Sequence, residues 1–334
     1  MRTLAAKVAP QRNTQYAALA SALAAPELRL SPLGPIIDAI RAISIAGQAY
    51  LLVDLTADLT GSQTASLGQT GATSEFFWYH ESVGGVTGPF LQPIETPSSA
   101  ALPAEIVEAR RYRGKTNELF SQVMINIARW SYMGSPSRLL DPLMGGGTVP
   151  FIALRLGLDA IGIERDRAAV ESTDTYLTAF LREAGIRNQR KAERAGGGRR
   201  TIFTIHSPAS GRPLHAALIH GDTREAPALL TGLPGGARAD LLVTDLPYGI
   251  QHEGQVESLV REALPAWHAV AAADAVLALA WNATRLPRDR MIAWLETGHR
   301  WHVMRGGAWE SLAHSVDRVI KRRDVIVARR GGAV

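Results

Sequence analysis

The tetrapeptide Asp245-Leu246-Pro247-Tyr248 follows an apolar segment and carries the clearest chemical potential of the chain. Pro247 fixes the backbone beyond a predicted strand, so that Tyr248 projects from its carboxyl edge. The Asp245 carboxylate and the Leu246 carbonyl can hold both N–H groups of a planar nitrogen and direct its lone pair at a methyl group. Tyr248 can stack on an unpaired base, a contact worth ~1–3 kcal/mol. The pattern predicts methyl transfer to an exocyclic amine or an amide; the alternative is a turn that caps a buried strand.

A glycine-rich stretch from Asp141 to Thr148 follows a short apolar strand and leads into a helical segment. Glycines let the backbone approach a ligand closely. No Lys follows them, and Pro150 replaces the third glycine of a dinucleotide fingerprint, so a pyrophosphate ligand is disfavoured. Asp141 suits an ammonium group, and Glu164, at the end of the next strand, can hold both ribose hydroxyls. A ligand in which adenosine is joined to an amino acid, as in S-adenosylmethionine, fits both acids. The simpler alternative is that the glycines only form a tight β–α connection without a ligand.

A third acid, Asp222, comes just past another predicted strand. Its carboxylate can accept a hydrogen bond from an adenine amino group, although the residue fits equally well as a helix N-cap. Together with Asp141 and Glu164, it favours the ligand interpretation.

These motifs resemble class I methyltransferases that modify exocyclic amines, and more narrowly the Trm11-like and THUMP-associated RNA guanosine N2-methyltransferases with a UPF0020-like catalytic domain. The resemblance covers about residues 105–330 and includes Arg113 to Phe120, where that family has a segment that folds over the cofactor. It departs from the family in two places: Lys115-Thr116-Asn117 replaces the usual His-Pro pair, and residues 1–105 show no recognisable THUMP pattern.

The resemblance implies S-adenosylmethionine as cofactor and Asp245, Leu246, Pro247 and Tyr248 as the catalytic motif. The cofactor-binding residues that it implies are Asn117, Phe120, Asp141, Leu143, Met144, Gly145, Gly147, Thr148, Glu164, Asp222, Thr223 and Asp245. It also implies an RNA substrate and a Rossmann-like seven-stranded sheet.

Two domains are expected: a smaller N-terminal α+β domain over residues 1–105, which is a candidate for substrate recognition, and a methyltransferase domain over residues 106–334. Apolar strand candidates alternate with helical segments after residue 106, which predicts an α/β fold with a mostly parallel sheet. Residues 299–305 and 316–328 lack a helix between them, so an antiparallel hairpin should end the sheet. The predicted parallel strands are 138–140, 160–163, 217–219, 241–243 and 275–279.

Three polar or aromatic stretches carry weaker signals. Residues 56–74 are rich in Thr, Ser, Gly and Gln, which predicts a surface loop. The basic, glycine-containing stretch 187–200 is typical of a solvated loop, with phosphate contact as the alternative. The aromatic run Phe76–Tyr79 is expected in the core, with base stacking as the alternative.

Composition limits the remaining classes of function. The 334 residues include no cysteine, which excludes disulfides and thiolate chemistry, and the nine histidines show no metal-ligand spacing, so no metal is expected. No apolar run reaches ~20 residues, so no membrane association is expected. A cytoplasmic location is expected instead. The net charge of +5 fits a polyanionic partner.

Three functions remain open at this stage. The first is methylation of guanine N2 in tRNA or rRNA. The second is methylation of adenine N6 in DNA or RNA, or of a glutamine or asparagine amide in a protein. The third is a non-catalytic module that binds the cofactor. Oligomeric state is left undetermined.

Overall fold

The computed structural model describes residues 2–331 except 12, 98–99, 113, 248–254, 300 and 317–320. The chain divides into two compact units, Met1–Ser99 with Arg305–Arg322 and Ala100–Met304 with Arg323–Val334. The first change of unit lies close to the boundary expected near residue 105. The return of Arg305–Arg322 to the first unit was not expected, because a short excursion within a domain leaves no compositional signal.

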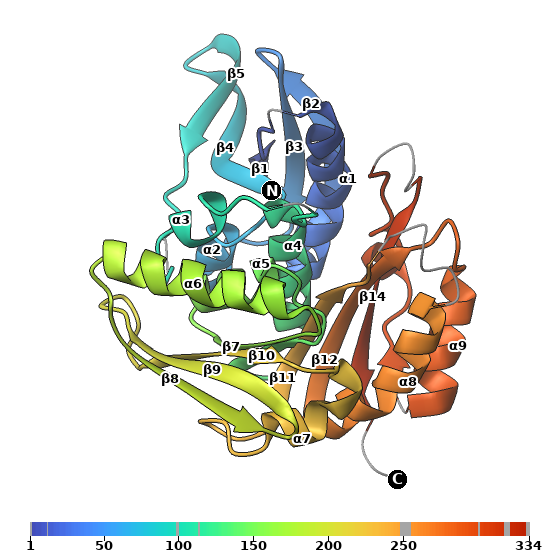
Figure 1. The fold of residues 1–334 in the computed structure, drawn as a ribbon. Helices are drawn as coiled ribbons and strands as arrows, with labels where there is room; N and C mark the ends of the chain where they lie inside the picture. The colour runs from blue at the N-terminus through green and yellow to red at the C-terminus, as the bar shows by residue number, and fades with distance from the viewer. Residues whose placement is uncertain are drawn as a thin grey trace. The chain divides into compact units, whose positions relative to one another are not determined.

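The first unit is an antiparallel five-stranded sheet in the order β2-β3-β1-β4-β5. Its long helix α1 contacts β1 and β3 (Figure 1). The fully buried Glu27 of α1 accepts hydrogen bonds from the N–H groups of Gly71 and Ala72, which ties the helix to the start of β4. The elements are β1 Arg2–Val8, α1 Thr14–Leu30, η1 Gly34–Ile36, β2 Ile37–Ile45, β3 Gln48–Leu55, α2 Gly61–Leu67, β4 Thr73–Val83, β5 Val86–Pro93 and η4 Gly307–Glu310.

The loop expected over residues 56–74 contains the short helix α2. Thr60 Oγ1 accepts a hydrogen bond from Gln63 N–H, and Gln63 Oε1 accepts one from Thr60 N–H, which forms a capping box. Leu67 is buried beneath the helix end. The loop prediction was wrong here because the capping signal lies within a polar composition.

The aromatic run lies on β4, where Phe76 is buried and Phe77 to Tyr79 are partly buried. Phe77 packs against a small apolar cluster that includes Tyr50 and Leu52. The run therefore contributes to the packing of the first unit.

The second unit is built on a nine-stranded sheet in the order β13-β14-β12-β11-β6-β7-β10-β9-β8. Strands β10, β7, β6, β11 and β12 are parallel, which confirms the five predicted strands. Strand β14 is antiparallel to both β12 and β13, which confirms the predicted terminal hairpin. Helices α4 to α6 cover one face and α7 to α9 the other (Figure 1). This is the Rossmann-like α/β fold that was expected.

The bounds in the second unit are as follows. Its helices are α3 Glu105–Glu108, α4 Glu118–Ser131, α5 Thr148–Arg155, α6 Arg167–Glu183, η2 Thr223–Glu225, α7 Ala226–Leu230, α8 Gln255–Val270 and α9 Arg288–His299. Its strands are β6 Arg138–Asp141, β7 Asp159–Glu164, β8 Arg187–Ala195, β9 Gly198–His206, β10 Leu214–His220, β11 Ala239–Asp245, β12 Ala271–Asn282, β13 Trp301–Val303 and β14 Arg323–Arg330.

Two strands more than the expected seven come from the hairpin β8–β9, which pairs through β9 with β10. The loop interpretation of residues 187–200 was therefore wrong. Strand β9 buries Ile202, Phe203 and Ile205, and this burial holds the hairpin on the sheet. The charged edge strand β8 showed no apolar alternation, so the sequence pattern did not reveal it.

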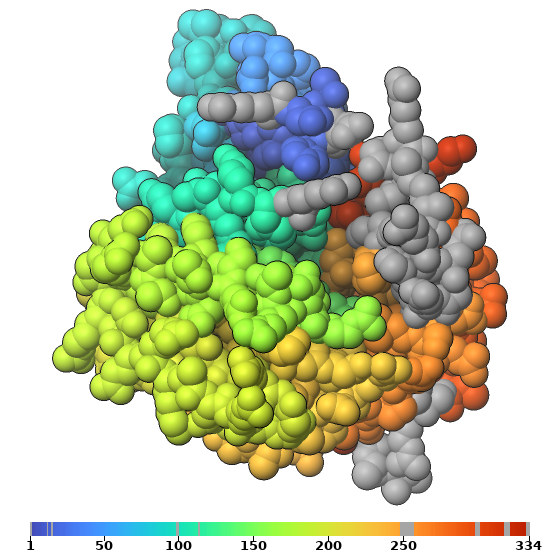
Figure 2. Space-filling view, viewed as in Figure 1, coloured from blue at the N-terminus to red at the C-terminus, as the bar shows by residue number. Residues whose placement is uncertain are grey.

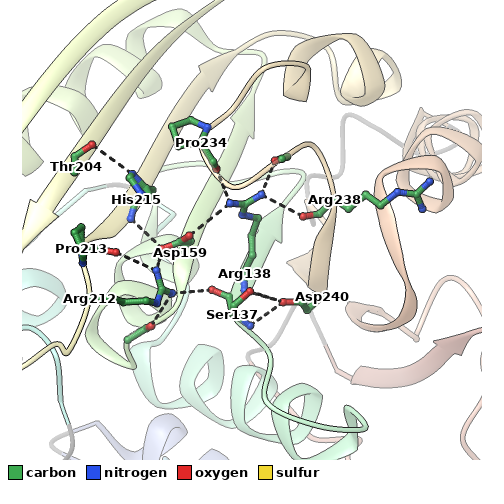
Figure 3. A network of polar contacts seen from close by, with 12 residues as sticks. Ser137, Arg138, Asp159, Thr204, Arg212, Pro213, His215, Pro234, Arg238 and Asp240 are labelled. Carbon is green, nitrogen blue, oxygen red and sulfur yellow. Dashed lines mark hydrogen bonds and ion pairs between the residues drawn. The ribbon is translucent and has the colours of Figure 1, made fainter.

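Two ion pairs of Asp159 lie at the edge of the sheet where the parallel strands begin, and the one with Arg138 is buried (Figure 3). Asp159, the first residue of β7, accepts hydrogen bonds from Arg212 Nη1 (2.7 Å) and His215 N–H (3.0 Å). It also forms an ion pair with Arg138 Nη2 (3.5 Å), and Arg138 donates to two loop carbonyl groups. These contacts join the starts of β6, β7 and β10 at the edge opposite the carboxyl ends.

Replacing Asp159 with asparagine should lower the free energy of unfolding of the second unit by ~3 kcal/mol, because it leaves the buried Arg138 without its countercharge. Urea titration followed by the fluorescence of the buried tryptophans measures the change. The matched control Glu171→Ala removes an exposed pair with Arg167 and should cost less than ~1 kcal/mol. Equal effects of the two substitutions would contradict the prediction.

Candidate active site

A pocket of about 920 Å³ lies at the carboxyl ends of the parallel strands β6, β7, β10 and β11. This is the edge at which open α/β sheets bind their ligands. Its volume is in the range of small-molecule sites. The lining residues are Tyr112, Gly114, Thr116, Asp141 to Gly146, Thr148, Val149, Glu164, Arg165, Gly221 to Arg224, Asp245 to Pro247, Ser258, Leu259 and Glu262. The pocket therefore brings the glycine turn, the three acids and the start of the Asp-Leu-Pro-Tyr motif together.

The glycine turn has local reasons for its composition. Gly147 forms the N-cap of α5 with φ +88°, a backbone conformation that residues other than glycine rarely adopt. A Cβ on Gly146 would lie 2.4 Å from the Tyr112 ring, so only glycine fits beneath that side chain. The Tyr112 hydroxyl is 2.5 Å from Thr148 Oγ1, which holds the aromatic ring over the turn.

Asp141 ends β6 and is buried, with 3% of its surface exposed. Its Oδ1 accepts a hydrogen bond from Leu143 N–H (3.1 Å). Burial raises the pKa of Asp141 to about 7, and the neighbouring Glu164 and Asp245 carboxylates add to the rise. A cationic ligand group in this pocket would offset the cost of ionising Asp141.

Glu164 ends β7 and is held by the backbone on both oxygens. Its Oε2 accepts a hydrogen bond from Gly145 N–H (3.0 Å), and its Oε1 accepts one from Asp166 N–H (2.7 Å). Each carboxylate oxygen has a second lone pair for a further hydrogen bond. The arrangement can bind two vicinal hydroxyls, and it also links the glycine turn to the next strand.

Asp222 is the N-cap of η2, and its side chain accepts a hydrogen bond from Arg224 N–H. The Arg224 guanidinium also binds both Asp222 oxygens (2.9 and 2.6 Å) and Glu262 Oε2 (2.5 Å). Hydrogen bonding to Arg224 lowers the pKa of Asp222. The N-cap interpretation of the sequence is confirmed, and the carboxylate still lines the pocket.

Asp245 ends β11 with its two oxygens in different surroundings. Oδ2 accepts a hydrogen bond from Thr116 Oγ1 (3.3 Å) and lies 3.6 Å from Arg323 Nη2. Oδ1 is buried and has no hydrogen-bond partner among the described residues. Burial raises the pKa of Asp245 to about 6, while Arg323 and Thr116 limit the rise. A buried acceptor without a partner is costly, and a ligand N–H group would satisfy it.

The pocket lining includes most of the residues predicted from the sequence, but not all. Asn117 caps α4 by accepting a hydrogen bond from Phe120 N–H, and the buried Phe120 ring lies beneath the Arg323 guanidinium at 4.6 Å. Neither Asn117 nor Phe120 lines the pocket, and Gly147 does not either. Tyr248 lies outside the described residues.

The sequence did not predict several residues that line the pocket or contact its acids. Arg224 follows Asp222 by two positions, and this spacing was a local signal that the two side chains could pair. Thr116 lies within the segment that was singled out, but its contact with Asp245 needed the structure. Ser258 and Glu262 on α8, and Arg323 on β14, come from distant segments without a local motif.

This fold, with an acid-lined pocket at the carboxyl edge and the terminal antiparallel hairpin, defines an S-adenosylmethionine-dependent class I methyltransferase. The family described as UPF0020, RMKL-like, methyltransferase domain, matches residues 109–307, and the chain belongs to that family. The chain is therefore an enzyme, and S-adenosylmethionine is its cofactor. The non-catalytic alternative is excluded.

Solved structures resemble the chain at low identity. TrmN from Thermus thermophilus has 13% identity and a TM-score of 0.46, over 99% of this chain and 100% of that chain. The rRNA methyltransferase aviRa from Streptomyces viridochromogenes has 17% identity and a TM-score of 0.41, over 70% and 92%. A putative RNA methyltransferase from Pyrococcus horikoshii, PH1948, has 17% identity and a TM-score of 0.39, over 70% and 91%. No curated protein matches the chain.

The described residues include neither a membrane-spanning helix nor a metal-binding cluster. None of their helices is long and apolar enough to span a bilayer. No group of three or more acidic or histidine side chains among them is placed to hold a metal ion.

Proposed function

We propose that this enzyme transfers a methyl group from S-adenosylmethionine to an exocyclic amine of a nucleobase in RNA, with guanine N2 in tRNA or rRNA as the favoured target. The observation that carries the proposal is Asp245 Oδ1, a buried acceptor without a partner among the described residues, in a pocket shared with Asp141 and Glu164. The proposal includes a cytoplasmic location for the enzyme, where tRNA and rRNA substrates would be available.

The donor set of the pocket fits the cofactor. Asp141 would hold the ammonium group, and its ionisation would be favoured by that contact. Glu164 would hold the ribose hydroxyls through the free lone pairs of its two oxygens. Asp222 would face adenine, and the glycine turn would lie against the methionine part. The sulfonium supplies an activated methyl group.

Asp245 would orient the acceptor amine. Thr116 and Arg323 hold Oδ2, which leaves Oδ1 for one N–H of the substrate. Leu246 donates its N–H to Ala280 O (2.9 Å), which anchors the backbone one bond before the Leu246 carbonyl that would accept the second N–H. With both protons held, the nitrogen lone pair would point towards the methyl group. As the N–C bond forms and the S–C bond breaks, the amine loses one proton, and Asp245 is placed to take it up.

Support for RNA comes from two features. The motif resembles that of the RNA guanosine N2-methyltransferases, and the chain carries a net charge of +5. Adenine N6 and side-chain amides present the same planar nitrogen chemistry, so they are alternative outcomes of the test.

Nucleoside mass spectrometry of cellular RNA from a deletion strain tests the proposal. Loss of N2-methylguanosine at one site, restored by the wild-type gene and not by the Asp245→Ala variant, is the expected result. Loss of N6-methyladenine, or of a methylated glutamine or asparagine in the proteome with RNA unchanged, would contradict guanine N2 as the acceptor and identify the lost group as the acceptor instead.

The pH dependence follows from the state of Asp245. The carboxylate must be ionised to accept an amine N–H, and its pKa is raised to about 6 by burial. The single-turnover rate should therefore rise with pH and level off above about 7, falling roughly tenfold per unit well below 6. Rapid-quench assays with saturating cofactor measure this profile. A rate that stays level down to about pH 5 would contradict the role given to Asp245.

A further inference from the structure

The hairpin β8–β9 places a row of side chains across the carboxyl edge of the sheet. Glu164 on β7 is the register partner of His220 on β10, His220 is the partner of Arg199 on β9, and Arg199 is the partner of Arg194 on β8. Neighbouring strands are ~4.8 Å apart, so Arg194 lies about 14 Å from the pocket strand β7. The row begins at an acid of the pocket and ends in two arginines at the hairpin tip.

No ion pair with a described acid balances the charges at the tip. Arg194 and Arg199 are both exposed, and neither forms an ion pair within the described part of the chain. Three other cations of the hairpin form ion pairs: Arg190 with Asp174 (2.6 Å), Lys191 with Glu193 (2.5 Å) and Arg200 with Glu193 (2.6 Å). Like charges directly opposite each other across two strands destabilise a hairpin. The repulsion between Arg194 and Arg199 therefore destabilises the unliganded hairpin, and a bound anion would relieve it.

A third exposed arginine lies on the same edge. Arg165 directly follows Glu164, is exposed and lines the pocket, and forms no ion pair with any described residue. Arg165 follows β7 on one side of β10, and the two tip arginines lie on β9 and β8 on the other side. In Figure 2 the yellow-green and yellow atoms of α6 and the hairpin form open surface.

We propose that the tip of the β8–β9 hairpin, with Arg194 and Arg199, binds the phosphate backbone of the single-stranded RNA segment that presents its base to the pocket. This inference rests on the proposed function and adds the surface that recognises its substrate. Strand β11, which carries Asp245, is four strands from β9, or ~19 Å, a span of a few nucleotides.

The chemistry of the tip favours phosphate over another strand or protein copy. A charged edge strand resists pairing with a further strand, because arginine side chains and their hydration cover the edge. Guanidinium groups bind phosphate oxygens through two parallel hydrogen bonds. Gly197 (φ +81°) in the turn has open space where a side chain would lie, whereas Gly196 packs against the backbone of Ala228.

The test is a binding titration of a fluorescein-labelled single-stranded RNA of ~20 nucleotides over a series of salt concentrations. The double variant Arg194→Ala/Arg199→Ala should raise Kd about tenfold and reduce the slope of log Kd against log salt by ~1.4, which corresponds to two lost phosphate contacts. The cofactor affinity should not change, because neither side chain lines the pocket. The melting temperature should not fall, because the substitutions remove a repulsive pair.

The matched control is Arg187→Ala, an exposed arginine of the same strand whose register partner is His206 at the other end of the hairpin, ~24 Å away. Its Kd and salt slope should stay at wild-type values. An unchanged Kd in the double variant, or an equal loss in Arg187→Ala, would overturn the inference. Wild-type protein that binds this RNA through the tip but methylates no RNA would leave the hairpin inference standing and refute the proposed function.

Discussion

Replacing Asp245 with alanine should lower the rate of methyl transfer about 1000-fold and leave the Kd for S-adenosylmethionine within about threefold of wild type. The loss follows from the position of Oδ1, which is buried, has no partner among the described residues and would hold the acceptor amine. Single-turnover transfer from labelled cofactor measures the rate, and calorimetric titration measures cofactor binding. A large effect on Kd with an intact rate would assign Asp245 to the cofactor instead.

An asparagine at position 245 separates acceptor chemistry from packing. Arg323 and Thr116 donate towards Oδ2, so they should orient the amide oxygen of asparagine towards themselves. The amide NH₂ would then face the substrate amine, donor against donor, and Asp245→Asn should be nearly as slow as the alanine variant. The control Asp274→Ala, an exposed acid on β12, should retain wild-type rates. Full activity of Asp245→Asn would show that the carboxylate charge is not needed.

Replacing Glu164 with alanine should raise the Kd for S-adenosylmethionine about 100-fold, since the variant would lose two charge-assisted hydrogen bonds of roughly 1.5–3 kcal/mol each, partly offset by solvent. It also removes the acceptor for Gly145 N–H, which loosens the glycine turn. Calorimetric titration with cofactor or its demethylated product measures the loss. Glu164→Gln, which keeps one acceptor oxygen, should lose less.

The control for this prediction is Glu171→Ala, which removes an exposed acid from α6 and its surface pair with Arg167. Its cofactor affinity should match wild type. If Glu164→Ala binds the cofactor normally while its rate falls, the carboxylate acts on the acceptor side of the pocket, and the ribose assignment is wrong.

Elements with a local signal in the sequence form as predicted. The five parallel strands were predicted because each is a short apolar run bounded by turn residues. Four acids, Asp141, Glu164, Asp222 and Asp245, lie at the end of such a strand or just beyond it. Since parallel strands end at one edge of a sheet, their proximity followed from the fold class. The hairpin β8–β9 was missed because its edge strand is charged on most positions, and helix α2 was missed within a polar segment.

The sequence by itself determined the class of reaction, because an acid after an apolar strand, a glycine turn and a proline-fixed motif are contiguous patterns with local causes. Only the tertiary structure decided which lone pairs stay free. Arg323 on the last strand and Thr116 before α4 converge on one oxygen of Asp245. Backbone N–H groups hold both oxygens of Glu164, and the register of β7, β10, β9 and β8 aligns two arginines with the pocket edge. Such contacts join residues far apart in the chain, and their energies depend on burial and register that no local pattern records.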